Sequence, residues 1–410
     1  MEKLALLGGN PTKTRKFPEW PQYDQKEEKA LMEVLQSRVW WRTPGTKTLE
    51  FEQKFAEYQQ AKYGIACTNG TAALEIVMAA LGIGLGDEVI VPDYTFVASA
   101  SAVLFTGAMP VMVDIDPGNY CIDPLKVIAA ITPRTKAVVA VHLAGHPADL
   151  DRLQEICRIH NLFLIEDSAH AHGSEWKGQK VGSIGTAGTF SFQSSKLMTA
   201  GEGGMITTNL ENLAVQIRSV HDCGRMPGQW FYSHYIYGSN YRLSEWQGAI
   251  LMQQLSRLDE QNAKRNKNAA HLDKALAGIE GICPQTLDPR VTNNGHYCYI
   301  FHFDSKFFNG LNTEKFIEAI NAEGIPTQAS YPPVHNLDVF QNGEFRKRLS
   351  PEHAKQPFNF LKSEFPISED AANNTVWLVH RTLLGTEEDC AEIVSSIQKI
   401  QAFSKDLTSL

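Results

Sequence analysis

The sequence predicts an α/β protein with a doubly wound, largely parallel sheet, followed by a smaller α+β domain. Three observations indicate this fold class. Short apolar, β-branched runs alternate with amphipathic helical segments over the first 210 residues. The runs lack the polar alternation of a strand with one solvated face. Near residue 244 this alternation stops and a long helical pattern begins.

Seven runs predict the strands of the large sheet. They are YGIACTN (63–69), EVIVPD (88–93), MPVMVDI (109–115), KAVVAVHL (136–143), LFLIEDS (162–168), AGTFSF (187–192) and GGMITT (203–208). Segments between them, such as LDRLQEICRIHN, place apolar residues at helical spacing. We therefore expect a seven-stranded, mainly parallel sheet with helices on both faces.

The residues from Ser244 to about 279 contain no strand pattern and predict one long connecting helix. After it come one strand (HYCYIFHFD, 296–304), a helix (TEKFIEAINAEG), a Pro-rich loop (YPPVHNLDVF) and a last helix. Ile393, Ile397 and Ile400 share one face of that last helix. The expected domains are a large one over residues 1–250, with an N-terminal arm, and a small α+β one over 251–410.

Composition and charge exclude several classes of protein. The chain has 410 residues, of which 43% are hydrophobic, which is typical of a folded globular protein. Its 38 basic and 46 acidic residues give a net charge of −8, which argues against nucleic acid or an anionic membrane as a partner. No apolar run approaches the roughly 20 residues of a membrane span, and the N-terminus does not resemble a secretory signal. We expect a cytoplasmic protein.

Cysteine and histidine spacing predicts neither disulfides nor a metal site. The seven cysteines never approach CxxC spacing, which favours reduced, buried thiols. His142 with His146, and His170 with His172, form close pairs, but neither pair comes with cysteines or an HExxH pattern.

In an open α/β sheet, ligands bind where strands end, so the residues after each run are the candidates for function. The first strand is followed at once by Asn69-Gly70-Thr71, a small-residue turn that opens a helix. Free backbone N–H groups, the helix dipole and a Thr hydroxyl there suit a phosphate; an ordinary strand-to-helix turn is the alternative. The Gly-rich GIGLGDE (82–88) precedes a strand and does not match a dinucleotide-binding fingerprint.

Three further places carry candidate residues. Asp167 ends the most apolar run, and a buried acid needs a cation, either a cofactor ring nitrogen or a structural Arg. The nearby His170 is either a catalytic residue or a hydrogen-bonded core histidine, and its position alone favours neither. Lys196 lies between small polar residues and a Gly-rich turn; it is either a Schiff-base lysine in an enclosed site or a solvated surface residue. Asn240 and Arg242 could present donors to an anion.

Together these places point to one cofactor. Pyridoxal 5′-phosphate requires a lysine for its aldehyde, an acid for its ring nitrogen and a cup for its phosphate. Lys196, Asp167 and the turn at Gly70 supply this combination, which is far more specific than any one of them.

At these residues the chain resembles the DegT/StrS family of pyridoxal-phosphate-dependent sugar aminotransferases, from residues 17–21 to residues 379–381. It is most similar to the 3-amino-5-hydroxybenzoate synthase and scyllo-inosose aminotransferase branch. The motifs that carry this likeness are WWR (40–42), YCIDP (120–124), DSAHAHG (167–173), FSFQ (190–193), KLMTAGEGG (196–204) and GSN (238–240). The resemblance implies a fold-type I transferase that works as a homodimer.

The resemblance also implies roles for individual residues. Lys196 matches the Schiff-base lysine and Asp167 the partner of the ring nitrogen. The other implied cofactor contacts are Gly70, Thr71, Ser191 and Gln193 at the phosphate, Asn240 reaching the phosphate from the neighbouring subunit, Phe96 stacking on the ring, and Ala169 and His170 beside it.

The reaction that the resemblance implies is transfer of an amino group from L-glutamine or L-glutamate to a keto group on a sugar or cyclitol ring, as in amino-sugar and antibiotic biosynthesis. Candidates for contact with the acceptor are Trp41, Arg42, Tyr331 and His335, together with His380 and Arg381, although each could instead be a packing or interface residue. Two alternatives stay open. One is an eliminating or aromatising enzyme with the same cofactor, and the other is a sensor or binding protein without turnover.

Overall fold

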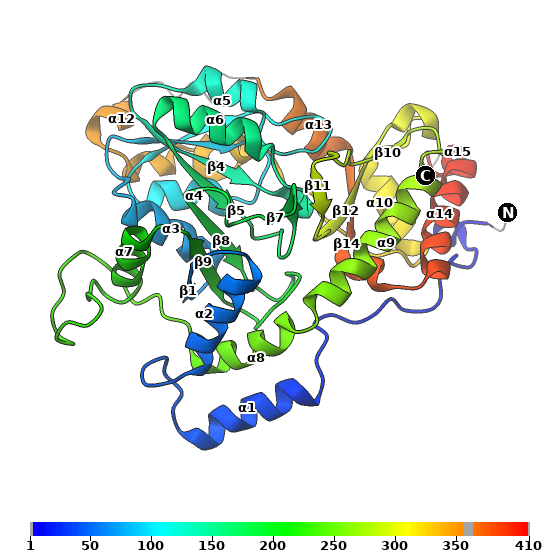
Figure 1. The fold of residues 1–410 in the computed structure, drawn as a ribbon. Helices are drawn as coiled ribbons and strands as arrows, with labels where there is room; N and C mark the ends of the chain where they lie inside the picture. The colour runs from blue at the N-terminus through cyan, green and yellow to red at the C-terminus, as the bar shows by residue number, and fades with distance from the viewer. Residues whose placement is uncertain (1–2, 356–363, 409–410) are drawn as a thin grey trace.

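The computed structural model of the chain describes residues 3–355 and 364–408 (Figure 1). Its central feature is a seven-stranded sheet with the order β1-β9-β8-β5-β4-β2-β3. The strands are β1 (Tyr63–Cys67), β2 (Glu88–Pro92), β3 (Met109–Val113), β4 (Thr135–Val141), β5 (Phe163–Asp167), β8 (Ala187–Ser191) and β9 (Gly204–Thr208). All seven predicted runs are strands of this sheet.

One strand departs from the parallel pattern. β9 pairs antiparallel with β8 on one side and with β1 on the other, while the remaining six strands share one direction. A parallel return would need a long crossover, usually a helix, and residues 192–203 contain none. These residues instead form the loop that carries Lys196.

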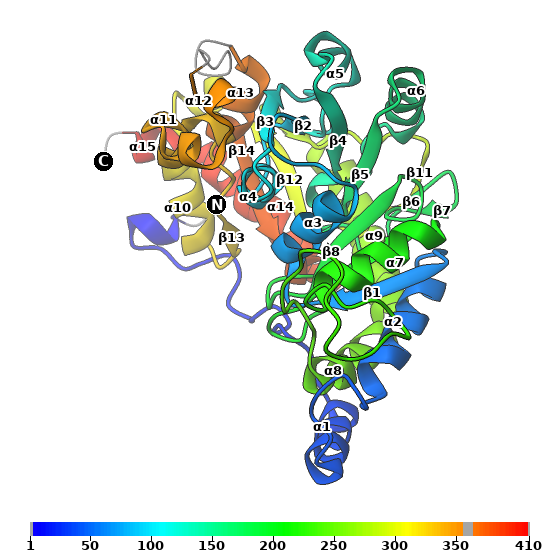
Figure 2. The same cartoon turned by 90° about the vertical axis from the view of Figure 1, so that its left-hand side faces the viewer.

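Helices cover both faces of the sheet, as the sequence predicts (Figure 2). One face packs against α2 (Lys47–Tyr58), α5 (Pro124–Ala130), α6 (Leu150–His160) and α8 (Glu245–Leu255). The other packs against α3 (Gly70–Ala80), α4 (Ala98–Phe105) and α7 (Glu211–His221). Strand residues alternate between the two cores: Ile90 belongs to the core on the face that carries α2, whereas Val89 and Val91 belong to the core on the face that carries α3.

The second part of the chain is built on a four-stranded antiparallel sheet in the order β10-β12-β14-β13. The strands are β10 (Ile282–Pro284), β12 (Cys298–Phe303), β13 (Thr327–Gln328) and β14 (Thr375–Val379), and the main helices are α9 (Leu258–Leu276), α10 (Thr313–Ala322) and α14 (Glu387–Ala402). The predicted strand, helix and last helix are β12, α10 and α14. β10 and β13 are too short for their sequence to predict them.

The connector differs from the prediction of a single long helix. It is two helices, α8 and α9, separated at Ser256 and Arg257. α8 packs against α1 (Gln25–Ser37) and α2, whereas α9 packs against α14. Arg257 donates to the Gln22 carbonyl at 3.1 Å and pairs with the Glu27 carboxylate. The residue at the break between the two helices therefore also binds the N-terminal arm.

The N-terminal arm crosses the molecule. Leu4 and Phe17 are buried with Ile393 and Ile397 in the core of the second part of the chain. In Figure 1 the dark-blue N-terminal segment lies beside the red α14 before it crosses to α1. The domain division at residue 250 stays a prediction, but these arm residues pack with the C-terminal helices.

The remaining elements are short. A three-stranded sheet, β11-β6-β7, joins the two parts through β6 (Glu175–Trp176), β7 (Gln179–Lys180) and β11 (Val291–Asn293). The others are η1 (Ala5–Leu7), η2 (Leu143–Gly145), η3 (Ser305–Phe308), η4 (Val334–Asn336), α11 (Asp338–Gln341), η5 (Glu344–Arg348), α12 (Pro351–Lys355), α13 (Pro366–Asn374), η7 (His380–Leu384) and α15 (Ser404–Leu407). Within the described ranges, no helix combines the length and apolar character that crossing a bilayer requires.

Candidate active site

A cavity of about 740 Å³ opens at the carboxyl ends of five strands of the large sheet. Thr68, Thr95, Val141, Asp167 and Ser191, which lie at or just after the ends of β1, β2, β4, β5 and β8, all line it. This is the edge at which open α/β sheets bind ligands. The predicted residues that line it are Gly70, Thr71, Phe96, Asp167, Ala169, His170, Ser191, Gln193, Lys196 and Tyr331.

The start of α3 forms a concave cradle in this cavity. The Asn69 side chain caps the helix by accepting from the Ala72 N–H at 2.8 Å, and the first-turn N–H groups of Gly70 and Thr71 have no partner within the helix. A Cβ at Gly70 would lie 2.8 Å from the Cβ of Ser191. Glycine therefore lets the end of β8 approach the helix terminus, which is a favourable place for a phosphate.

Asp167 points into the cavity from the end of β5. Its Oδ2 accepts from the Ser99 hydroxyl at 2.9 Å and its Oδ1 from the Ala169 N–H at 3.2 Å. Burial raises the pKa of this carboxyl, while the two hydrogen bonds and the charge of Lys196 oppose the rise. A cationic group opposite Asp167 would complete the stabilisation of its charge.

Lys196 faces the same cavity from the β8–β9 loop. Its Nζ lies 4.4 Å from the centre of the Tyr297 ring, and the Tyr297 hydroxyl lies 2.9 Å from Ser195 Oγ. Within the described part of the chain, Lys196 makes no ion pair. Burial lowers the pKa of Lys196 to about 8, although the charge of Asp167 opposes the shift. About a tenth of the amine is therefore unprotonated at pH 7, far more than for an ordinary lysine.

An aromatic wall closes one side of the cavity. The His170 ring stacks on Tyr297 with centroids 3.9 Å apart, and burial lowers its pKa well below the ordinary value. His170 Nδ1 accepts from the Ala144 N–H, which places the proton of the neutral ring on Nε2, 3.2 Å from the Tyr331 hydroxyl. Phe96, half exposed, lies 5.9 Å from the Tyr331 ring.

Several predicted residues lie away from this cavity in a single chain. Arg42 pairs with buried Glu52 at 2.8 Å, and His335 binds Asp93 through Nδ1 at 2.7 Å. Trp41 packs edge-on against the exposed α7–α8 loop. Asn240, also in that loop, is exposed.

His380 and Arg381 lie behind the aromatic wall. The buried His380 ring packs edge-on against Trp20, with centroids 4.5 Å apart, and lies 6.3 Å from Tyr297. Arg381 donates to the Pro18 carbonyl at 3.2 Å and lines a separate pocket.

The residues at the cavity that the sequence did not predict include Ser99, Tyr297, Glu75 and Tyr241. Ser99 sits on α4 and reaches Asp167 only because β2 and β5 lie in one sheet. Tyr297 precedes β12, far from Lys196 in sequence. Glu75 lies one turn beyond Thr71 and faces the same side of α3, a spacing that could have indicated it; its carboxylate accepts from the Tyr241 hydroxyl at 3.3 Å.

His142 and His146 serve as internal hydrogen-bonding groups. His142 donates to Glu166 Oε2 at 3.1 Å, and His146 Nδ1 binds the Pro147 carbonyl at 2.7 Å. In the ranges that the structure covers, no group of three or more His, Cys, Asp or Glu side chains is placed to hold a metal ion.

The cavity has the parts that pyridoxal 5′-phosphate needs. A glycine cradle fits the phosphate, a lysine without an ion-pair partner fits the aldehyde, and a buried carboxyl fits the ring nitrogen. Fold and cavity together define a fold-type I pyridoxal-phosphate-dependent transferase.

Comparison with known proteins identifies the family of the chain. The sequence profile of the DegT/DnrJ/EryC1/StrS aminotransferase family matches residues 21–398. The chain belongs to this family, and it is a pyridoxal-phosphate-dependent aminotransferase.

Its relatives include enzymes of two kinds. An L-glutamine:2-deoxy-scyllo-inosose aminotransferase from Streptoalloteichus tenebrarius is 40% identical over 413 residues, with 97% of each chain covered. A 3-amino-5-hydroxybenzoate synthase from Amycolatopsis mediterranei is 38% identical over 398 residues, covering 94% of this chain and 98% of the relative. A crystal structure of 3-amino-5-hydroxybenzoic acid synthase superimposes with a TM-score of 0.86 at 36% identity, covering 95% of this chain and 99% of that one.

Proposed function

We propose that this chain transfers the amino group of L-glutamine to a ketone on a cyclitol ring. The observation that carries the chemistry is the meeting of Lys196, Asp167 and the Gly70 cradle in one cavity. The choice of substrates rests on the similarity to L-glutamine-dependent scyllo-inosose aminotransferases over nearly the whole chain. L-Glutamate as donor, or a keto sugar as acceptor, would use the same groups.

When bound, the cofactor supplies an electron sink for the carbanion that forms when the donor loses its Cα proton. Asp167, ionised, holds a proton on the ring nitrogen, and this cation is what makes the sink effective. The Ser99 hydroxyl and the Ala169 N–H hold both carboxylate oxygens in place, so the carboxylate needs little reorganisation.

Lys196 has two roles in the proposed reaction. Its amine holds the cofactor aldehyde in the resting enzyme. Once the donor amine displaces it, Lys196 moves a proton between the donor Cα and the aldehyde carbon of the cofactor. A pKa of about 8 suits this task, because both the acid and base forms are accessible near neutral pH.

The other proposed contacts surround the cofactor. Gly70, Thr71, Ser191 and Gln193 hold the phosphate, while Phe96, Ala169 and His170 lie against the ring. The Gln193 side-chain oxygen Oε1 accepts from the Ser195 N–H at 2.8 Å, and its amide nitrogen donates to Ser194 Oγ at 3.2 Å, which leaves the second N–H of that amide for the phosphate. Tyr331, with its hydroxyl beside His170, is the predicted substrate contact that the cavity geometry supports.

The site is completed by a second copy of the chain. Asn240 is exposed at the end of a loop whose side chains Trp230, Tyr232, Tyr235 and Tyr237 are largely exposed. An exposed aromatic surface of this kind is typical of an interface. We propose a homodimer in which Asn240 reaches the partner's phosphate. Trp41 and Arg42 would contact the acceptor only if that interface brings them to a cavity. A role for His335 requires it to leave Asp93.

A labelling experiment tests the proposed reaction. The cofactor-loaded protein is incubated with 2-deoxy-scyllo-inosose and L-glutamine whose α-amino nitrogen carries an isotope label. The proposal expects labelled amine on the ring and none with Lys196→Ala. Unlabelled ring product, or no consumption of glutamine, would contradict it.

A second candidate is an aromatising dehydratase of the 3-amino-5-hydroxybenzoate synthase type. The specific observation in its favour is the similarity in sequence and structure to that synthase. In that reaction Lys196 would remove a ring proton from an amine-bearing substrate, and no amine would leave glutamine. Formation of an ultraviolet-absorbing aromatic product without glutamine consumption would favour this candidate.

A further inference from the structure

A fully buried arginine lies outside the proposed active site. Arg265, on α9, has no exposed surface. Its Nη1 donates to Asn262 Oδ1 at 2.7 Å, but Nε and Nη2 have no hydrogen-bond partner. The proposed reaction makes no use of this residue.

The two unpartnered nitrogens are on the same edge of the guanidinium. On this edge the Nε–H bond and one Nη2–H bond are parallel. Arginine uses this geometry to bind an anion through two hydrogen bonds. A guanidinium also keeps its proton under all ordinary conditions. Arg265 therefore presents a charged, two-pronged donor inside the protein.

No side chain of the described residues supplies the matching negative charge. Burial lowers the pKa of Arg265 to about 9, and no carboxylate opposes the shift. Burial lowers the pKa values of His172, His296 and His380, and the charge of Arg265 lowers each further, so all three are neutral and none supplies a counter-charge. A buried cation without a counter-charge is strongly unfavourable.

The free edge lies where several segments meet. The Trp20 ring of the N-terminal arm covers the guanidinium at 5.8 Å. Trp20 also donates from Nε1 to the carbonyl of Ser194, in the loop that carries Lys196, and packs against His380 of η7. The buried His172, between β5 and β8, lies close enough to feel the charge of Arg265 but is neutral, so it adds no counter-charge.

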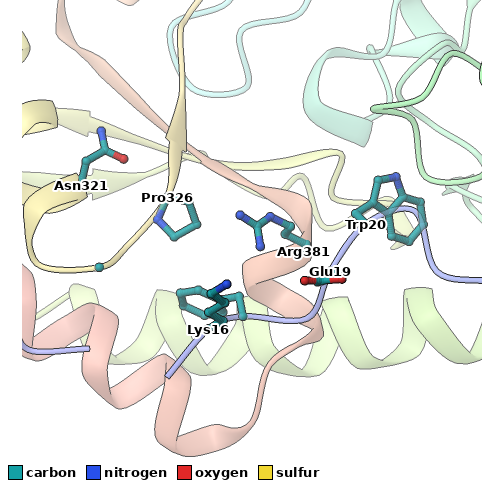
Figure 3. Close-up of a pocket in the computed structure, with 8 residues that line it drawn as sticks. Lys16, Glu19, Trp20, Asn321, Pro326 and Arg381 are labelled. Carbon is teal, nitrogen blue, oxygen red and sulfur yellow. The ribbon is translucent and has the colours of Figure 1, made fainter. Parts of the chain in front are cut away.

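A surface pocket of about 640 Å³ adjoins Trp20, between the arm and the second part of the chain. Lys16 and Arg381 extend into it, beside a single acidic side chain, Glu19 (Figure 3). Its net positive lining draws anions toward Trp20.

We propose that Arg265 holds a small monovalent anion, chloride in the cell, on its Nε–Nη2 edge beneath Trp20. A monovalent ion fits better than phosphate or sulfate, because burial penalises each additional charge. The bound ion neutralises Arg265 and joins the arm, α9, η7 and the Lys196 loop. Its effect is on stability, and it does not depend on the proposed reaction.

The first test is thermal unfolding of the full-length, cofactor-loaded protein in sodium chloride against sodium gluconate at equal ionic strength. Chloride should raise Tm saturably by about 2–4 °C. Arg265→Lys keeps the charge but loses the two-pronged edge, so the response should disappear. Arg158→Lys, at an exposed arginine of α6, is the matched control and should respond like the wild type. Equal Tm values of the wild type in both salts would overturn the proposal.

The second test locates the ion and does not require any variant to fold. Crystals of the wild-type protein are grown in sodium bromide, and bromide is found by its anomalous scattering. The proposal expects a peak within hydrogen-bonding distance of both Nε and Nη2 of Arg265. Bromide only at surface sites, or a carboxylate of the chain on that edge, would overturn it.

Discussion

At the scale of single residues, burial acts on the two groups on which the chemistry depends. It lowers the pKa of Lys196 and so favours the free amine, whereas it raises the pKa of Asp167, a rise that the hydrogen bonds from Ser99 and Ala169 oppose. These effects need no cofactor, so they can be measured on the apo-protein.

The pKa of Lys196 is open to direct test. Below about pH 8 the side chain is an ammonium, and above it the free amine predominates, whereas an ordinary lysine changes near 10.5. The rate at which the apo-protein takes up pyridoxal 5′-phosphate should therefore rise with pH and level off above about 8. Nα-acetyl-lysine, measured in parallel, corrects for titration of the reagent. A rate that keeps rising to pH 10 would contradict the lowered pKa.

Asp167→Asn tests the partner of the ring nitrogen. An amide cannot hold a proton there, so we expect the cofactor to bind but kcat to fall on the order of a hundredfold or more. Asp338→Asn, at an exposed carboxylate, is the matched control and should keep full activity. The absorption spectrum gives cofactor occupancy, and steady-state kinetics give kcat. A kcat near that of the wild type would contradict the role of Asp167 as partner of the ring nitrogen.

The sequence identifies the residues whose chemistry is local and misses those brought in by the fold. Lys196 and Asp167 stand at strand ends beside small residues, and such positions can be recognised in one chain. Ser99 and Tyr297 reach the same cavity from α4 and from the residue before β12. Nothing in their own neighbourhoods indicates this, because a serine on a buried helix and a tyrosine before a strand are ordinary.

At the scale of elements, the contact between α3 and β8 forms the cradle. A Cβ at Gly70 would collide with Ser191, so Gly70→Ala must push the helix terminus away from the strand. Overpacking of this kind costs about 1–3 kcal/mol. Where this penalty is felt in cofactor binding, the affinity for pyridoxal 5′-phosphate should drop roughly ten- to hundredfold.

Gly278→Ala is the control for this change, because the nearest heavy atom to its added Cβ is 4.0 Å away. Cofactor titration by fluorescence measures both variants. Affinity unchanged by Gly70→Ala would show that the cradle does not hold the phosphate.

The order of elements was predictable where patterns are long. All seven strands of the large sheet were predicted, since each is an apolar run bounded by turns. The direction of β9 was not, because direction depends on what the 192–203 loop can span. The predicted connector helix was wrong at Ser256 and Arg257, where Arg257 binds the arm residues Gln22 and Glu27, some 230 positions away.

At the scale of the whole molecule, one chain holds a nearly complete cavity, but Asn240 lies outside it. If the partner supplies Asn240, each active site takes Lys196 from one subunit and Asn240 from the other. Lys196→Ala and Asn240→Asp, each inactive or weakly active alone, should then complement after mixing and re-assembly. Random pairing leaves one intact site in half of the dimers, or about a quarter of wild-type activity.

Mixing Lys196→Ala with Asp167→Asn is the control, because both residues belong to the same side of the site and no intact site can form. The activity of each mixture, normalised to total subunits, is the measurement. No recovery with Asn240→Asp in dimers shown to be mixed would exclude a shared site.

The central claim is that this chain takes an amino group from a donor through a cofactor on Lys196. The most direct measurement is the absorption spectrum of the protein with pyridoxal 5′-phosphate, before and after L-glutamine is added without any acceptor. We expect a visible band from the lysine-bound cofactor that glutamine converts to the near-ultraviolet band of pyridoxamine phosphate. A visible band that neither glutamine nor glutamate changes would contradict the transfer, and no visible band at all would contradict the assignment of Lys196.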